Sequence, residues 1–445
     1  MTAPQLSVAF FLQMFFILVV CRSVAALVRR FGQPQVVGEM IAGVLMGPSL
    51  IGLLLPAFQQ QIFPNESLKM LFVGGQLGVG LYMFLVGVEF KAEVFRARVH
   101  SAVAVSVAGM LVPFALGAGL ALWMVTIPGM FAERTTTFAA VLFMGAAMSI
   151  TAFPVLARII HDHGLTGTAL GTLALSAGCI GDAAAWGVLA VVIASVGGGV
   201  VVAVKAIAGG VAFSVFMLTL GRRLLIRLGS ATELAGRLTP ALLTLVMTLF
   251  TLAAWITDAI GLHAVFGAFL LGVAMPRGVL TRELKRQLEP FAVVFLLPMF
   301  FTFSGLNTRL DMVDDLPLLL VAIAVLVAAC LGKGVACWAA ARLNGESNRI
   351  ALAVGALMNA RGLMELIVLA IGLQHEIIGP ALFSVMVLMT IVTTLLASPL
   401  FEWVYGRHAR AAGELGVVAM SADEPATSPE RGRRGAAPNE RGARA

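Results

Sequence analysis

Charged residues are scarce in this sequence. They make up 12% of its 445 residues, about half the share that is usual in soluble globular proteins. Hydrophobic residues make up 60%, and apolar runs of roughly 18 or more residues follow one another with short loops between them. The composition therefore excludes a soluble fold and predicts an all-α protein that crosses a membrane many times.

Groups that carry enzymatic or metal chemistry are also sparse. The four cysteines, Cys21, Cys179, Cys330 and Cys337, lie within apolar runs and lack the spacing of a metal site. The sequence shows no nucleophile–base arrangement and no nucleotide-binding loop. We therefore expect no catalytic residues, no cofactor and no enzyme activity. The net charge of +7 comes from basic residues in short loops, which does not predict nucleic-acid binding.

About thirteen apolar segments are predicted to span the membrane. The loops between them alternate sharply in Lys and Arg content. By the positive-inside rule, this places the N-terminus outside and the C-terminus in the cytoplasm, and we expect a bacterial inner membrane. The predicted spans cover residues 7–28, 35–55, 68–90, 99–125, 135–159, 169–196, 200–221, 238–258, 261–276, 288–306, 316–341, 349–372 and 379–404.

The composition changes abruptly after residue 406. Residues 407–445 are rich in Arg, Ala, Gly, Pro and Glu and have no apolar periodicity. This pattern predicts a disordered cytoplasmic tail, which is too short for a nucleotide-binding regulatory domain. Residues 1–406 then form the membrane transporter domain.

Two predicted spans are interrupted near their middle. Span 135–159 contains Pro154, which removes a backbone hydrogen bond, and span 349–372 contains a polar run at residues 359–365. An unwound backbone is tolerated in a membrane only where it packs in protein or lines a cavity. The two spans are seven apart, so they run in opposite directions. This pattern predicts an inverted-repeat transporter with two crossed discontinuous helices.

The implied repeats comprise residues 7–196 and 238–404, joined by a linker helix at 200–221. Crossed discontinuous helices bring two positive N-terminal ends and two negative C-terminal ends close to the membrane centre. We expect Glu365 to compensate an N-terminal end and Arg361 a C-terminal end, with Asn359 beside them.

Asp182 lies in the middle of an apolar run. An ionisable group at that depth costs at least about 2.5–3.5 kcal/mol on insertion scales and usually marks an ion or proton path. As a carboxylate it is a hard oxygen ligand for a small monovalent cation, and as a neutral acid it releases that cation. One carboxyl group that binds either a cation or a proton is sufficient for antiport. The structural alternative is a buried salt bridge between Asp182 and Lys333, the second charge within a span.

Several motifs resemble the monovalent cation:proton antiporter-2 family, a group of sodium/hydrogen exchanger-like proteins. The stretches TAFPVLAR and NARGLMEL are most similar to the plant cation/proton exchanger branch and its bacterial relatives. The motifs lie at residues 33–39 (QPQVVGE), 42–49 (AGVLMGPS), 83–89 (MFLVGVE), 149–158 (SITAFPVLAR), 300–306 (FFTFSGL) and 358–366 (MNARGLMEL).

The resemblance implies a thirteen-span homodimer with a dimerisation domain and a six-helix core domain that moves like an elevator. It implies exchange of Na⁺ or K⁺ for H⁺, with roles in ion transport and pH homeostasis. The ion-binding Asp of the family falls on Asp182, its core-domain basic residue on Lys333 and its unwound-span Thr on Thr151. Candidate ligands near the break are Ser149, Ala152 and Ser176.

The sequence departs from the family pattern at Gly181. Many electrogenic members carry two adjacent acids in this span, and here the first acid is replaced by glycine. This favours electroneutral one-for-one exchange. It also leaves Lys333 to pair with Asp182 or to be deprotonated in the ion-free state. Proton-coupled export of an organic ion and channel-like K⁺ efflux are the alternative functions on the same fold.

Overall fold

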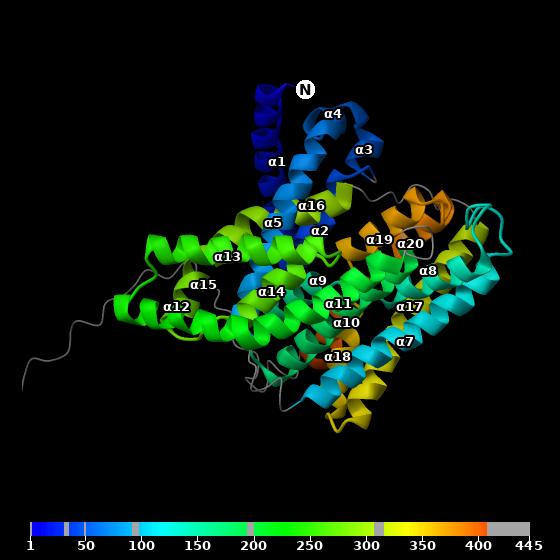
Figure 1. Cartoon of the computed structure of the whole chain (residues 1–445). Helices are drawn as coiled ribbons and strands as arrows, with labels where there is room; N and C mark the ends of the chain where they lie inside the picture. The colour runs from blue at the N-terminus through cyan, green and yellow to red at the C-terminus, as the bar shows by residue number, and fades with distance from the viewer. Residues whose placement is uncertain are drawn as a thin grey trace, which may run out of the picture.

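The computed structural model describes residues 2–30, 35–48, 50–90, 98–193, 200–306 and 316–406. Nearly all of these residues are helical, as predicted (Figure 1). Within the described ranges the only extended pairing is an isolated antiparallel bridge between Phe131 and Ile378. The predicted tail at 407–445 lies outside the described residues.

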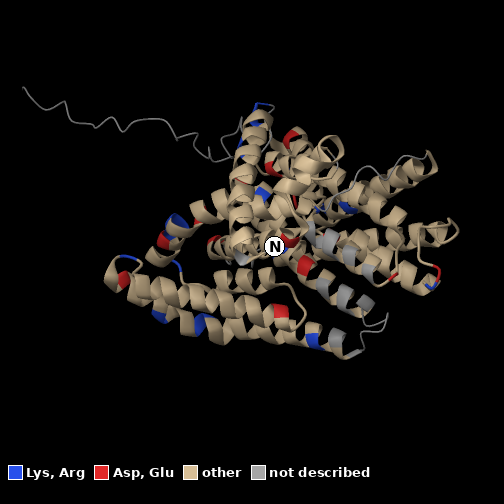
Figure 2. Ribbon diagram, turned by 90° about the horizontal axis from the view of Figure 1, so that it is seen from above, with Lys and Arg blue, Asp and Glu red and all other residues tan. Residues whose placement is uncertain are grey.

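The helices account for all the predicted spans. Among the described residues, ten helical segments, some of them interrupted, are long and apolar enough to cross a membrane, judged by length and composition. Three shorter apolar helices coincide with the remaining predicted spans, at Ala169–Ala185, Ala264–Ala274 and Asn348–Leu357. Figure 2 shows long uncharged stretches along these helices, which is the distribution that a hydrocarbon environment requires.

The helices pack in two groups. The helices called the scaffold group here pack on one another: α1 (Ala3–Arg29), α2 (Gln35–Met46), α5 (Asn65–Glu89), α13 (Pro240–Ala259), α14 (Ala264–Ala274), α15 (Val279–Phe291) and α16 (Leu297–Leu306). The core group comprises α7 (Val99–Met124), α8 (Thr137–Ser149), α9 (Phe153–Asp162), α10 (Ala169–Ile193), α17 (Leu316–Leu343), α18 (Asn348–Leu357), α19 (Leu363–Gln374) and α20 (Pro380–Phe401). Each predicted repeat contributes three of its spans to each group.

Short helical segments complete the described chain. Two lie between α2 and α5: α3 (Ile51–Leu54) and α4 (Pro56–Ile62). A π-helical turn at Ala292–Leu296 joins α15 to α16, and another at Glu402–Gly406 follows α20. The predicted span 35–55 is therefore not one helix, because α2 ends at Met46 and α3 begins after it.

The predicted linker 200–221 is too short. Helix α11 (Val200–Phe216) continues through a π-helical turn at Met217–Gly221 into α12 (Arg222–Ala235). The span was predicted to end at the first arginines, because charged side chains mark the membrane boundary. They do not end a helix, however, and the arginines of α12 remain helical with exposed side chains. The helix stops where Gly236 adopts a left-handed φ of 65°, a conformation that favours glycine.

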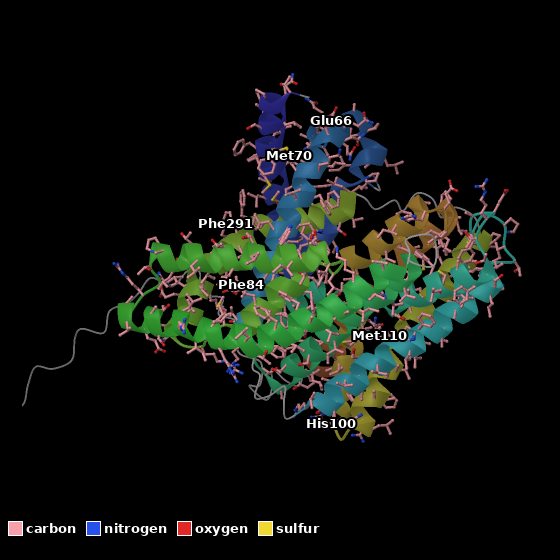
Figure 3. All side chains as sticks on the ribbon, viewed as in Figure 1. Glu66, Met70, Phe84, His100, Met110 and Phe291 are labelled. Carbon is pink, nitrogen blue, oxygen red and sulfur yellow. The ribbon has the colours of Figure 1, made fainter. Side chains whose placement is uncertain are left out.

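Glycines bring the scaffold helices into backbone contact. A Cβ atom on Gly87 of α5 would meet the carbonyl oxygen of Phe269, and one on Gly272 of α14 would meet that of Phe84. Phe84, labelled in Figure 3, also packs against Phe250 with ring centroids 5.9 Å apart. Small residues at helix crossings are the usual means of close packing in membranes, and here they hold α5 tightly to α14.

Candidate ion-binding site

Both predicted interruptions are present. Helix α8 ends at Ser149 and α9 begins at Phe153, while α18 ends at Leu357 and α19 begins at Leu363. Pro154 lies in the first turn of α9, where a missing N–H breaks no helical hydrogen bond. It therefore starts a new helix rather than kinking an existing one.

The two interruptions are joined by a backbone hydrogen bond. The N–H of Ala152 donates to the carbonyl of Ala360 over 3.1 Å. On the other side of the second interruption, the N–H of Arg361 donates to Thr394 Oγ1 over 3.0 Å, and this hydroxyl also lies 2.8 Å from the Arg361 carbonyl. Thr394 lies on α20 and did not stand out in the sequence. It satisfies backbone groups for which no water is present in a hydrocarbon environment.

Two buried cations cover the C-terminal end of α8. Arg361 Nη1 and Nη2 donate to the carbonyls of residues 147 and 148 over 3.3 and 2.8 Å. Lys333 Nζ donates to the carbonyls of residues 149 and 150 over 2.6 and 2.7 Å. The last carbonyls of a helix have no partners within it and carry a partial negative charge. Both cations therefore lie at the end of a helix that attracts positive charge.

Glu365 lies in the first turn of α19, at a positive helix end. Its Oε1 atom is 2.9 Å from Arg361 Nη1, and both side chains are fully buried. Arg361 thus contacts one anion and one helix end at the same time. The structure places both residues where the sequence predicted them, and their effect on the helix dipoles stays a prediction.

Asp182 lies on α10, is 1% exposed, and its Oδ2 atom has no hydrogen-bond partner among the described residues. The glycines before it allow close packing on both sides. A Cβ on Gly178 would lie 2.7 Å from Leu156 of α9, and one on Gly181 would lie 3.4 Å from Ser106 Oγ of α7. Asp182 is thereby held in the core group as a buried carboxyl group with a free oxygen.

The expected pair between Lys333 and Asp182 is wrong for this structure. Among the described residues, Lys333 donates to the two carbonyls at the end of α8 and forms no ion pair with Asp182. The helix end offers the ammonium two acceptors. A sequence reveals a buried lysine but does not reveal that backbone carbonyls are its partners.

The other predicted ligands are also buried. Thr151 and Ala152 lie within the interruption itself. The hydroxyl of Ser149 lies within hydrogen-bonding distance of the carbonyls of Gly145 and Met110 (the latter labelled in Figure 3), and Ser176 donates to Thr172. These two hydroxyls therefore use their protons within the protein and have only oxygen lone pairs to offer a cation.

Besides Glu365 Oε2, two neutral buried oxygens close to these elements have no partner among the described residues. They are Asn359 Oδ1, at the second interruption, and Ser106 Oγ, beside Gly181. Asn359 was predicted to support the helix ends, and its amide nitrogen donates to the Gly355 carbonyl over 2.9 Å. Ser106 was missed, because a serine in an apolar span gives no signal until its neighbour is known.

Helix α9 also connects the two groups at its C-terminal end. Asp162 accepts a hydrogen bond from the N–H of Val36 in α2 over 3.0 Å and forms an ion pair with Arg158 at 3.0 Å. His161 Nε2 lies 2.9 Å from Glu289 Oε1 of α15. A carboxylate at the first N–H groups of a helix is stabilised by their partial positive charge. These contacts join the core group to the scaffold group.

The family model of the transmembrane sodium/hydrogen exchangers matches residues 15–405. The chain belongs to this family. The Na⁺/H⁺ antiporter NhaS4 of Synechocystis is 39% identical over 389 residues, which cover 86% of this chain and 94% of that protein. The resemblance drawn from the motifs is confirmed.

Other relatives of this exchanger are longer. Cation/H⁺ antiporter 18 of Arabidopsis thaliana is 34% identical over 91% of this chain, and K⁺/H⁺ antiporter 1 of Saccharomyces cerevisiae is 31% identical over 89%. The chain spans about half of each, 50% and 46%. The solved sodium proton antiporter MjNhaP1 of Methanocaldococcus jannaschii matches 92% of this chain and 98% of its own with a TM-score of 0.58 and 15% identity, which shows that the fold is shared.

Replacing Lys333 in this exchanger should lower thermal stability. In Lys333→Met, the carbonyls of Ser149 and Ile150 lose their donor in a region without water, and an unsatisfied buried polar group costs about 1–3 kcal/mol. Thermal unfolding of the purified protein measures the effect. Lys205→Gln, which changes an exposed lysine of α11, is the control and should unfold like wild type. Equal unfolding temperatures for wild type and Lys333→Met would contradict the assigned role.

Proposed function

We propose that this chain is a secondary active transporter that exchanges Na⁺ or K⁺ for H⁺ by alternating access. The observation that carries the proposal is the buried Asp182 carboxyl group, which has a free oxygen in the core group. Membership of the family and the relatives named as Na⁺/H⁺ and K⁺/H⁺ antiporters support it.

The cation and the proton compete for Asp182. When the carboxyl group is ionised, its oxygens are hard ligands of the kind that small monovalent cations prefer. When it is protonated, it is neutral and attracts no cation. Ser106 and Asn359 have partner-free oxygens that could complete the cation's shell, together with Thr151. The carbonyls of residues 149 and 150 already accept from Lys333 and contribute less.

Exchange is proposed to be electroneutral. Gly181 precedes Asp182 and supplies no second carboxyl group. The other buried carboxylate of the crossing, Glu365, is paired with Arg361. One titratable group then serves each cation, so one positive charge moves in each direction.

Access to Asp182 is proposed to alternate as the core group moves against the scaffold group, like an elevator. Asp182 belongs to the core group, and the positive-inside rule places the C-terminal end of α9 on the cytoplasmic side. We propose that the contacts of Asp162 with Val36 and of His161 with Glu289 hold the two groups together on that side. They must break for that side to open.

The remaining proposals concern the protein in its membrane. We expect the N-terminus outside and the C-terminus in the cytoplasm of a bacterial inner membrane, on the evidence of the Lys and Arg distribution. We also expect a homodimer that forms through the scaffold group, which would leave the core group free to move.

Asp182→Asn should abolish cation-driven proton flux while the protein still folds. The amide keeps the shape of the side chain but does not cycle a proton. Proteoliposomes with an internal pH dye, titrated with Na⁺, K⁺ and Li⁺, measure the flux. Asp258→Asn, at an exposed aspartate at the end of α13, is the matched control and should exchange normally. Persistent flux in Asp182→Asn would remove this residue from the mechanism.

Exchange should not respond to an imposed membrane potential. The reason is that a single carboxyl group carries either one proton or one cation. Flux is measured in proteoliposomes whose potential is clamped with valinomycin and graded K⁺, with Na⁺ as the transported ion. A rate that changes steadily with potential would show a second proton carrier, and Lys333 would be examined first.

Glu289→Gln should loosen the closed cytoplasmic side. The substitution removes the negative charge that His161 contacts, so α9 is held less firmly against α15. Hydrogen–deuterium exchange of peptides covering residues 35–39 and 158–163 should become several-fold faster. Glu283→Gln changes a carboxylate on the same helix that pairs with Arg286, and it should leave these peptides unchanged. Identical uptake in both variants would argue against a closing role.

A further inference from the structure

A large cavity is lined by residues of α10, α11 and α14. Its volume is about 820 Å³. Along α10, the side chains at Ser176, Ala183 and Val191 line it, so the cavity follows the helix that carries Asp182. Asp182 itself is not among the lining residues. Ser176, a candidate ligand by sequence, does line it, so the cavity runs beside the proposed cation site without including Asp182.

The lining is apolar apart from one end. Exposed aliphatic side chains of α11 face the cavity, including Val211 at 62% exposure and Val215 at 57%. Water in contact with such a surface is unfavourable by roughly 25 cal/mol for each Å² of apolar area. A hydrocarbon chain is a better occupant than water for this part of the cavity.

Among the polar side chains of the lining, one carries a charge. The two serine hydroxyls donate within their own helices, Ser176 to Thr172 and Ser214 to Gly210. Arg222 is the only charged lining residue, and among the described residues its exposed guanidinium is without an ion pair. An arginine at the end of an apolar channel, without a carboxylate in the lining, repels Na⁺ and K⁺. The cavity is therefore a poor path for the transported cation.

We propose that this cavity binds an anionic phospholipid, with an acyl chain along α10 and α11 and the phosphate at Arg222. Two further exposed arginines, Arg223 and Arg227, follow on α12, and clusters of basic residues at a membrane surface attract anionic head groups. This charge favours a phospholipid of the cytoplasmic leaflet over a neutral lipid.

The position of this site gives the lipid a role. Helix α10 belongs to the core group, whereas α14 belongs to the scaffold group. An acyl chain between them fills the cavity and forms a mobile apolar layer between α10 and α14. This layer would let the core group move against the scaffold group. Anionic lipid should therefore stabilise the protein.

Lipid retention tests the head-group contact directly. The detergent-purified protein is incubated with phosphatidylglycerol, phosphatidylcholine or palmitate, and bound lipid is measured by native mass spectrometry together with the unfolding temperature. Wild type should retain more phosphatidylglycerol than phosphatidylcholine or palmitate, and phosphatidylglycerol should raise its unfolding temperature. Arg222→Gln should bind it about fivefold more weakly, the effect of one basic residue near a membrane surface, while Arg29→Gln, at the exposed end of α1 and outside the lining, should change binding by less than about twofold.

A second variant tests the acyl-chain channel without changing any charge. Ser214→Phe places a ring in the cavity and should displace the retained lipid, whereas Ser230→Phe, on the exposed surface of α12, should not. The proposal would be overturned if wild type retained phosphatidylcholine equally well or preferred palmitate. It would also be overturned if Arg222→Gln or Ser214→Phe retained as much phosphatidylglycerol as wild type. The measurements do not depend on transport, so they remain decisive even if cation exchange is not observed.

Discussion

The C-terminal end of α8 is the feature on which the rest of this structure depends. A helix that ends inside a membrane leaves carbonyl groups without partners, and no water is present to satisfy them. Lys333 of α17 and Arg361 of the second interruption supply the donors for residues 147–150. Because Arg361 belongs to the other broken helix, each interruption stabilises the other. The crossing is therefore one cooperative unit rather than two independent kinks.

This arrangement leaves Asp182 available. Had Lys333 paired with the carboxylate, a cation would first need to displace an ammonium group. Instead the ammonium is bound to two carbonyls, Glu365 is bound to Arg361, and a carboxyl oxygen of Asp182 has no partner among the described residues. The helix end thus binds the positive side chains that would otherwise be available to pair with Asp182.

The features predicted correctly from the sequence are those whose residue types are rare in membrane spans. Asp182, the two interruptions and the buried Lys333 are all visible because charge, proline and polar runs are rare in such segments. The partners of Lys333 were not predictable, because every residue has a carbonyl group and a sequence does not show which ones are free. Ser106 and Thr394 were missed for a similar reason, since hydroxyls in spans usually bond to their own helix. The linker was placed too short because arginines mark a membrane boundary, whereas Gly236 marks the end of the helix.

The charges at the crossing are consistent with electroneutral exchange. In the proposed ion-free state, Lys333 and Arg361 are positive and Glu365 and Asp182 are negative, so these side chains sum to zero. Binding a proton or a monovalent cation adds the same single charge. Under the proposed exchange, the core group carries an equal charge in both loaded forms, so a membrane potential would favour neither direction. The proposal of electroneutral exchange therefore rests on Gly181, which occupies the position where a second acid would change this sum.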